Sequence, residues 1–229
     1  MNAQNTLVLL PGMDGTGELF APLLHELKQL DTTLKVIVMA YPRDIPLDYA
    51  TLTDRVVQQL SPDESFVLLG ESFSGPIATQ LAQQLGKRCQ GLILCVSFVH
   101  STVRMPRLTR ALSHLIPFGS MSRWPMRELP EALQNQLKKI VKTVSPTVWR
   151  SRFRAALNVD ERHTLRSLTC PILYLRARND RIVAASVADT IASIQPRTQI
   201  VDLDTSHFLL QTEASTAAHH IVDFMQRLN

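Results

Sequence analysis

Short apolar runs alternate along the chain with longer segments in which apolar residues recur every three or four positions. This alternation is typical of a mostly parallel β-sheet covered by helices on both faces. Several runs are nearly continuous in Val, Ile and Leu, as expected of strands buried on both sides. The predicted strands are Thr6–Leu10, Leu34–Ala40, Ser65–Leu69, Gly91–Phe98, Pro171–Arg176 and Gln199–Leu203.

The helical segments between these strands each present one apolar face that would pack on the sheet. The faces consist of Leu52, Val56, Val57 and Leu60; Ile77, Leu81 and Leu85; Val187, Ile191 and Ile194; and Ala218, Ile221, Val222, Met225 and Leu228. We therefore predict an α/β fold with a mostly parallel sheet of about six strands, in a single domain spanning residues 1–229.

The alternation is interrupted once, between residues 100 and 165. This segment is rich in proline and arginine and has helical patterns near 127–143 and 146–157. Because the strand pattern resumes at Cys170 and Pro171, we predict a helical cap inserted into the domain. Its large apolar residues would either line an acyl pocket or form the core of the cap: Leu112, Leu115, Ile116, Phe118, Trp124 and Met126.

Composition limits the class of protein. The 229 residues are 45% hydrophobic and 19% charged, which is typical of a globular enzyme-sized domain. No apolar run approaches the roughly 18 residues of a membrane span, and the start lacks the basic region of a secretory signal, so we expect a cytoplasmic protein. The three cysteines have no C-x-x-C spacing, and they indicate neither a disulfide framework nor a zinc site.

Positive charge is concentrated in the predicted cap. Residues 100–165 hold 12 of the 24 Lys and Arg residues and only four acids, although the whole chain has a net charge of just +4. This face is either a solvated basic surface or a docking site for an acidic partner, such as an acyl-carrier protein, the phosphates of coenzyme A or an anionic lipid surface. No nucleic-acid-reading motif is present, so we expect no nucleic-acid partner.

The sequence GESFSG at residues 70–75 places Ser72 on a turn between a predicted strand and a predicted helix. A serine nucleophile on such a turn is usually written G-x-S-x-G, with small residues where backbones approach closely. Here Ser74 occupies the position of the second glycine, and we expect its hydroxyl to cap the new helix. The alternative is that Ser72 is itself an ordinary helix-capping serine.

A second glycine-rich stretch, PGMDGTG at residues 11–17, follows the first predicted strand. A loop in this position can supply one donor of an oxyanion hole, and the residue after the nucleophile supplies the other. These donors would be the backbone N–H groups of Met13 and Phe73. The alternative is a glycine-rich turn without further role; neither phosphate-binding glycine motif is present.

A serine nucleophile needs a histidine base, and the histidine needs a carboxylate that fixes its tautomer. Of the seven histidines, His207 is the one that follows the last predicted strand on a loop; the others lie in predicted helices or in or beside the cap. Asp180 follows the preceding strand and precedes a helix, so it can reach His207 across the strand ends. Asp202 and Asp204 are the alternative acids.

The order Ser72, Asp180, His207, with each residue at the carboxyl end of a strand, resembles the α/β-hydrolase family along nearly the whole chain. The resemblance implies a serine esterase or thioesterase that needs no metal or organic cofactor; capped members that cleave esters of carrier-bound acyl chains are similar in layout. The chain departs from the family pattern at two places. Ser74 replaces the second glycine of the G-x-S-x-G motif, and Pro11-Gly12 stands where many members have His-Gly. Acyl transfer to an alcohol, and ligand binding without turnover, remain alternatives.

Overall fold

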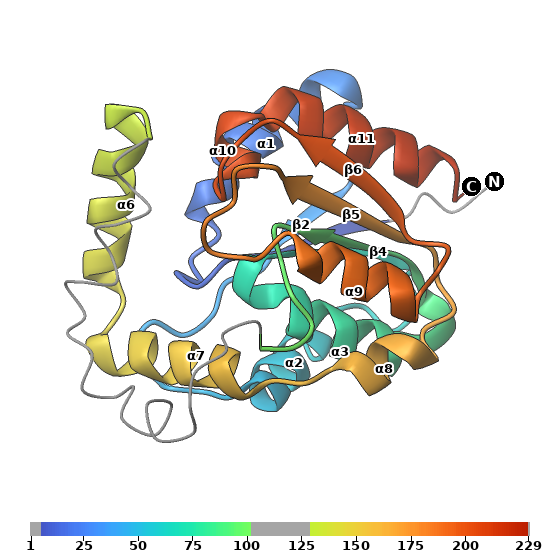
Figure 1. Cartoon of the computed structure of the whole chain (residues 1–229), viewed down its shortest axis with the longest axis horizontal. Coiled ribbons are helices and arrows are strands. Elements are labelled where there is room, and N and C mark those ends of the chain that lie inside the picture. Colours follow the sequence, from blue (N-terminus) through green and yellow to red (C-terminus); the bar gives the residue numbers. More distant parts are fainter. Residues whose placement is uncertain (1–5, 102–128, 229) are drawn as a thin grey trace.

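The computed structural model describes residues 6–101 and 129–228, which form a six-stranded parallel sheet in the order β2-β1-β3-β4-β5-β6 (Figure 1). All carboxyl ends of the strands therefore lie along one edge. The strands are β1 (Thr6–Leu10), β2 (Val36–Val38), β3 (Phe66–Glu71), β4 (Cys89–Cys95), β5 (Ile172–Ala177) and β6 (Gln199–Leu203).

The predicted strands are all present, and their bounds differ where the sheet ends or the backbone turns. β2 is shorter than predicted, because it lies at an edge and only residues 36–38 pair with β1. β4 ends at Cys95, three residues before the predicted end, because Val96 adopts a left-handed φ of 43° and leaves the strand. The central strands β1 and β3 are buried throughout, which explains their continuous apolar sequences.

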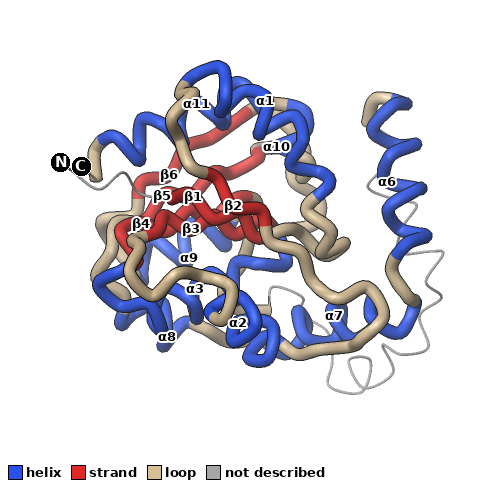
Figure 2. The backbone as a smooth tube through the Cα atoms, turned by 180° about the vertical axis from the view of Figure 1, so that it is seen from behind, coloured by secondary structure: helices blue, strands red, loops and turns tan. Residues whose placement is uncertain are grey.

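Helices cover both faces of the sheet, as predicted (Figure 2). Two apolar clusters, one on each face, form the core between sheet and helices. On one face lie α1 (Ala21–Leu30), α10 (Leu209–Thr212) and α11 (Ala214–Gln226). On the other lie α2 (Tyr49–Val57), α3 (Gly75–Leu85), α8 (Arg162–Ser167) and α9 (Ser186–Ile194). The described part of the chain also contains the short 3-10 helices η1 (Glu18–Phe20), η2 (Ser72–Ser74) and η3 (Gly86–Arg88).

Between β4 and β5 the described residues form α6 (Glu131–Thr143) and α7 (Pro146–Asn158), followed by α8. These two helices match the helical patterns near 127–143 and 146–157. In Figure 1, α6 stands beyond the carboxyl ends of the strands, away from the sheet. The apolar residues predicted for an acyl pocket, Leu112, Leu115, Ile116, Phe118, Trp124 and Met126, lie outside the described residues. A separate cap spanning 100–165 stays a prediction.

Among the helices of the described segments, none has the length and apolar character needed to cross a membrane.

Burial of α3 against the sheet gives a test of the core. Leu81 of α3 is fully buried, whereas Leu30 at the end of α1 is 38% exposed. We expect Leu81→Ala to lower the free energy of unfolding by about 2–5 kcal/mol, because it leaves a cavity, and Leu30→Ala to change it by less than about 0.5 kcal/mol. Urea unfolding of both variants measures the difference; equal losses would contradict this packing.

Candidate active site

Ser72 sits at the sharp junction between β3 and α3. Its backbone has φ of 48°, a left-handed conformation that is strained for a residue with a Cβ. The end of the neighbouring strand holds the turn in place, since the Ser97 hydroxyl donates to the Ser72 carbonyl at 2.5 Å. The strand-turn-helix junction that the sequence predicted is therefore present, with Ser72 at its tip.

The departure from the glycine pattern has a structural reason. A Cβ on Gly75 would lie 2.1 Å from the Ser97 hydroxyl and 2.5 Å from the Phe98 carbonyl, so this position requires glycine, as does Gly70, where a Cβ would lie 2.7 Å from the Ser74 carbonyl. Ser74 is fully buried, and its hydroxyl donates to the Pro11 carbonyl and contacts the Tyr41 hydroxyl at 2.7 Å. It makes no capping bond to α3, so the expectation of a helix cap is wrong. Ser74 instead ties the elbow to the loop after β1.

Ser72, His207 and Asp180 come together from three strand ends. The Ser72 hydroxyl lies 2.8 Å from His207 Nε2, and His207 Nδ1 lies 2.8 Å from Asp180 Oδ2. Asp180 Oδ1 accepts hydrogen bonds from the backbone N–H groups of Ile182 and Val183, which fix the carboxylate. With Nδ1–H donating to Asp180, Nε2 is free to accept the Ser72 proton. In this geometry His207 is placed to accept a proton from the Ser72 hydroxyl.

The alternative acids are engaged elsewhere. Asp202 forms an ion pair with Arg176, whose Nε lies 2.5 Å from Asp202 Oδ1 and holds the pKa of that carboxyl below its usual range. Asp204 accepts a hydrogen bond from Asn179. Asp180 is thus the carboxylate that contacts His207.

The predicted oxyanion loop lies beside the elbow. β1 and β3 are adjacent and parallel, with Leu10 opposite Gly70, so Met13 and Phe73 each follow three residues after this pair at the same edge of the sheet. The Ser74 hydroxyl donates to the Pro11 carbonyl, which joins the loop to the elbow, and Glu71 Oε2 lies 3.6 Å from the place that a Cβ on Gly12 would take. The two predicted donor residues, Met13 and Phe73, thus lie at the same edge of the sheet as Ser72.

Glu71, directly before Ser72, is a buried carboxyl that sequence reasoning missed. Gln211 of α10 donates to it at 2.9 Å, which links the elbow to the segment after His207. Burial raises the pKa of Glu71 to about 7; the Gln211 hydrogen bond opposes the rise and the Asp14 carboxylate adds to it. A single glutamate in a motif gives no signal of burial, so only the fold reveals this group.

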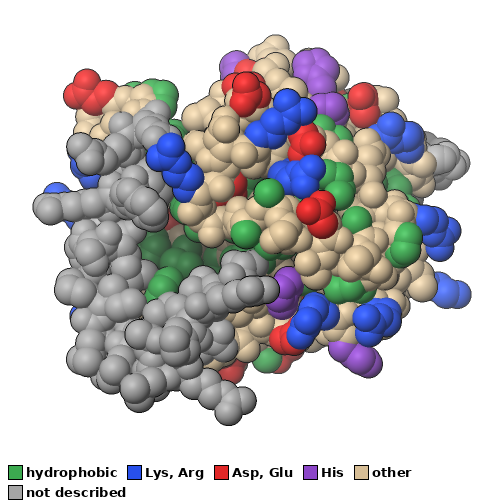
Figure 3. Space-filling model, in the orientation of Figure 1, with side chains coloured by type: hydrophobic (Ala, Val, Ile, Leu, Met, Phe, Trp, Pro, Cys, Tyr) green, Lys and Arg blue, Asp and Glu red, His purple; other side chains and the backbone are tan. Residues whose placement is uncertain are grey.

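An apolar cluster adjoins the site on the side of α6. Leu137 and Ile140 of α6 pack with Leu19, and the partly buried Phe208 that follows His207 packs against this cluster. Figure 3 shows recessed hydrophobic side chains on this face of the molecule. An apolar substrate group would find contacts here.

No group of three or more His, Cys, Asp or Glu side chains within residues 6–101 and 129–228 is arranged to hold a metal ion. Cys89 and Cys170 lie near each other at the opposite, amino-terminal edge of the sheet, with 3.8 Å between their sulfur atoms, and both are free thiols.

Comparison with known proteins decides the family. The model of the alpha/beta hydrolase family matches residues 7–218. The chain belongs to the alpha/beta hydrolase family. Membership supports a hydrolase activity. No curated protein matches the sequence.

Solved structures of similar fold cover almost the whole hydrolase chain. A lipase-esterase related protein from Clostridium acetobutylicum has a TM-score of 0.81 at 15% identity, covering 97% of this chain and 95% of its own. An enol-lactonase from Burkholderia xenovorans has a TM-score of 0.80 at 18% identity, covering 99% and 92%. An esterase from Exiguobacterium antarcticum has a TM-score of 0.77 at 17% identity, covering 99% and 93%. At such identities the likeness shows the fold.

The raised pKa of Glu71 predicts a pH-dependent stability. Since the folded-state pKa is about 7 and the ordinary value 4.5, the folded protein binds more protons than the unfolded chain between these values. This group therefore makes stability fall as pH rises from about 4.5 to 7. We expect Glu71→Gln to remove that contribution, so the variant gains stability relative to the parent from pH 5 to pH 8. Urea unfolding across this range tests it; a constant difference between the two proteins would contradict the assignment.

Proposed function

We propose that this hydrolase cleaves carboxylic esters or thioesters, with Ser72 as nucleophile, His207 as base and Asp180 as the acid that orients it. The observation that carries the proposal is the continuous pair of 2.8 Å contacts from Ser72 through His207 to Asp180, on a serine with strained backbone. The names of the similar structures, an esterase and an enol-lactonase, refer to open and cyclic ester substrates and support an ester bond as the target.

The proposed reaction proceeds in two acyl transfers. Ser72 Oγ attacks the substrate carbonyl carbon while His207 Nε2 accepts the hydroxyl proton. The tetrahedral oxyanion is held by the N–H groups of Met13 and Phe73, and it collapses as His207 passes its proton to the leaving alcohol or thiol. Water then gives a proton to His207 and attacks the acyl-enzyme, which releases the carboxylic acid and returns the proton to Ser72.

The acyl group of the proposed substrate is apolar. Phe208 and Leu133 are partly buried against the cluster of Leu19, Leu137 and Ile140. Phe208 follows His207 in the chain, and the two rings contact each other with their centres 6.0 Å apart, so the cluster is linked to His207 through Phe208. Burial of each methylene of an acyl chain contributes about 0.8 kcal/mol, so a preference for longer acyl chains would appear in kcat/KM.

Replacement of Ser72 tests the proposal directly. We expect Ser72→Ala to lower kcat for p-nitrophenyl esters by on the order of 10⁴–10⁶ and to abolish labelling by a fluorophosphonate. Asp180→Asn should lower kcat by on the order of 10⁴, because the imidazole loses its favoured tautomer. Ser193→Ala, at an exposed serine on α9, is the matched control and should keep full activity.

Near-full activity in Ser72→Ala would refute the assignment. An ester product formed faster than free acid in the presence of an alcohol would favour the acyltransferase alternative. Labelling of Ser72 without turnover of esters or thioesters would favour a binding protein with the hydrolase fold.

The prediction of an acidic acyl carrier can be tested on α6, where Lys138 and Lys139 are exposed. If such a carrier docks there, Lys138→Glu with Lys139→Glu should lower kcat/KM for acyl-carrier-protein or acyl-coenzyme A thioesters about tenfold at low salt. Activity on p-nitrophenyl esters should not change. Lys28→Glu with Lys87→Glu, at exposed positions outside the α6 and α7 region, makes the same change in net charge as a control. If both pairs of substitutions lower kcat/KM for these thioesters equally, α6 is not a docking site for the carrier.

A further inference from the structure

Arg152 of α7 is a buried cation in contact with the loop after β1. Arg152 is one of the basic residues of the predicted cap segment, yet its side chain is only 2% exposed. It is therefore not part of the charged surface that a partner would meet. Arg154, two residues along the same helix, is exposed and is an example of a basic residue on the surface.

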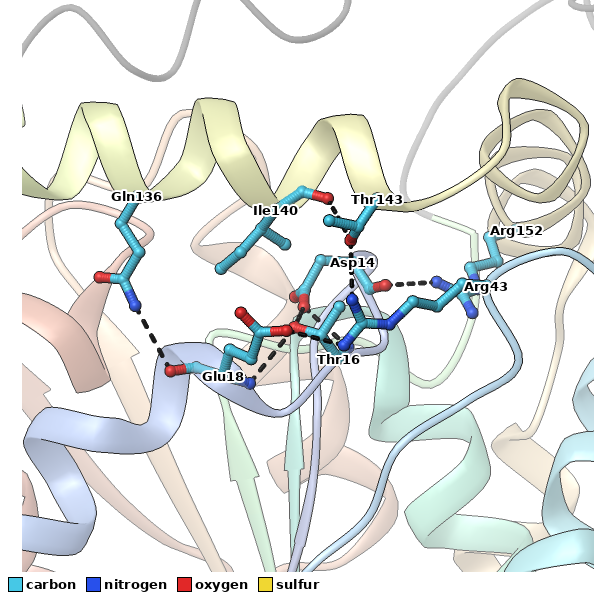
Figure 4. A network of polar contacts seen from close by, with 8 residues as sticks. All are labelled: Asp14, Thr16, Glu18, Arg43, Gln136, Ile140, Thr143 and Arg152. Atoms are coloured by element: carbon cyan, nitrogen blue, oxygen red, sulfur yellow. Dashed lines mark hydrogen bonds and ion pairs between the residues drawn. The ribbon is translucent and has the colours of Figure 1, made fainter.

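The guanidinium binds backbone carbonyls from two loops. Nη1 donates to the carbonyls of Met13 and Asp14, at 2.8 Å and 2.7 Å, and Nη2 donates to the carbonyl of Pro42 at 2.9 Å. The group also lies over the ring of Tyr41, 5.7 Å from its centre. A planar group with five fixed donors suits this set of diverging acceptors better than an ammonium does. Figure 4 shows Arg152 reaching the Asp14 carbonyl beneath α6.

The loop is shaped to accept this group. Gly15 has φ of 69°, and a Cβ there would lie 2.5–2.7 Å from the guanidinium atoms, so only glycine lets the backbone lie against Arg152. The turn is closed by a bond from the N–H of Gly15 to the carbonyl of Gly12, and the Gly15 carbonyl accepts from the N–H of Tyr41. The guanidinium therefore packs directly against the backbone of the loop at Gly15.

Burial of a guanidinium has a large desolvation cost. Burial lowers the pKa of Arg152 below its ordinary value, while the Asp14 carboxylate and Tyr41 act in the opposite direction. An apolar side chain would fill the same space without that cost but would leave the carbonyls of Met13 and Asp14 without their donor. The contribution of the Arg152 guanidinium is therefore its hydrogen bonds to the carbonyls of this loop.

We propose that Arg152 is a positioning residue for the oxyanion loop. By binding the carbonyls of Met13 and Asp14, it fixes the two peptide groups that follow Met13 and so limits the rotation of the residue whose N–H is the proposed oxyanion donor. The inference rests on the proposed function, because it concerns the donor that would hold the oxyanion. Through Arg152, a helix of the segment between β4 and β5 takes part in stabilising the transition state.

Further contacts hold α6 and α7 in place beside this loop. Arg43, which follows Pro42, pairs with Glu18 at 2.7 Å and donates to Thr143 at the end of α6 (Figure 4). The N–H of Ser145, between α6 and α7, donates to the Arg43 carbonyl at 2.8 Å. Both helices are thus bonded to the segments that carry the Arg152 acceptors.

The test compares Arg152→Met, Arg152→Lys and the control Arg154→Met, with active sites counted by fluorophosphonate titration. We expect Arg152→Met to lower kcat for a p-nitrophenyl ester about 10- to 100-fold, less than the loss of an oxyanion donor itself, with KM within about twofold. Arg152→Lys should recover part of kcat. The inhibition constant of a trifluoromethyl ketone, which mimics the tetrahedral oxyanion, should rise in proportion to the fall in kcat/KM.

Arg154→Met should leave kcat, KM and this inhibition constant at the values of the parent. The inference is overturned if kcat per titrated site is unchanged, if only KM moves, or if inhibition by the ketone is unaffected. Should Arg152→Met not fold, Arg152→Lys decides alone, since parental kcat and ketone inhibition in that variant would exclude the clamp. Failure of the parent protein to react with fluorophosphonate or to cleave any ester would instead refute the proposed function.

Discussion

The left-handed backbone of Ser72 is the constraint on which the rest of the site depends. A residue with a Cβ adopts φ of 48° only when its surroundings enforce it. Here the enforcement comes from the end of β4, where the Ser97 hydroxyl binds the Ser72 carbonyl and leaves no space for a side chain at Gly75. Tyr174 of β5 in turn donates to the Ser97 carbonyl at 2.7 Å. The strain at the elbow is therefore balanced by contacts across three neighbouring parallel strands, which is why the serine can stand above the sheet within reach of His207.

Much of the fold was predictable because its signals are local. Continuous apolar runs mark strands buried on both sides, and the order of Ser72, Asp180 and His207 at strand ends was enough to select the residues that the structure brings into contact. The roles of Ser74 and Arg152 were not predictable, because their partners are remote. Ser74 binds Pro11, 63 positions away, and Arg152 binds Met13, 139 positions away. Nothing in the neighbouring sequence separates a buried arginine from the exposed ones beside it, so its charge was assigned to the surface.

The substitution of serine for the second glycine of the elbow changes how the site is held together. Glycine at that position would supply only space, whereas the Ser74 hydroxyl joins the Pro11 carbonyl to the Tyr41 hydroxyl. The ring of Tyr41 lies under the Arg152 guanidinium, so a chain of buried polar contacts runs from the elbow to α7. Buried polar groups stabilise one arrangement only when each has its partner, and a change at any member of such a chain is expected to affect the others.

The loop after β1 lies between two buried side chains, the Glu71 carboxyl on one side and the Arg152 guanidinium on the other. The Glu71 carboxyl lies beside Gly12, and the guanidinium of Arg152 donates to the carbonyls of Met13 and Asp14. Hydrogen bonds to charged groups are stronger than those between neutral groups, and they gain further in a buried setting. The peptide groups of the loop are therefore oriented before any substrate arrives. An oxyanion site works by such fixed dipoles, since donors that need not reorganise during the reaction lower its barrier most. In the proposed mechanism the buried guanidinium of Arg152, whose desolvation costs stability, lies beside the donor whose fixed orientation affects the rate.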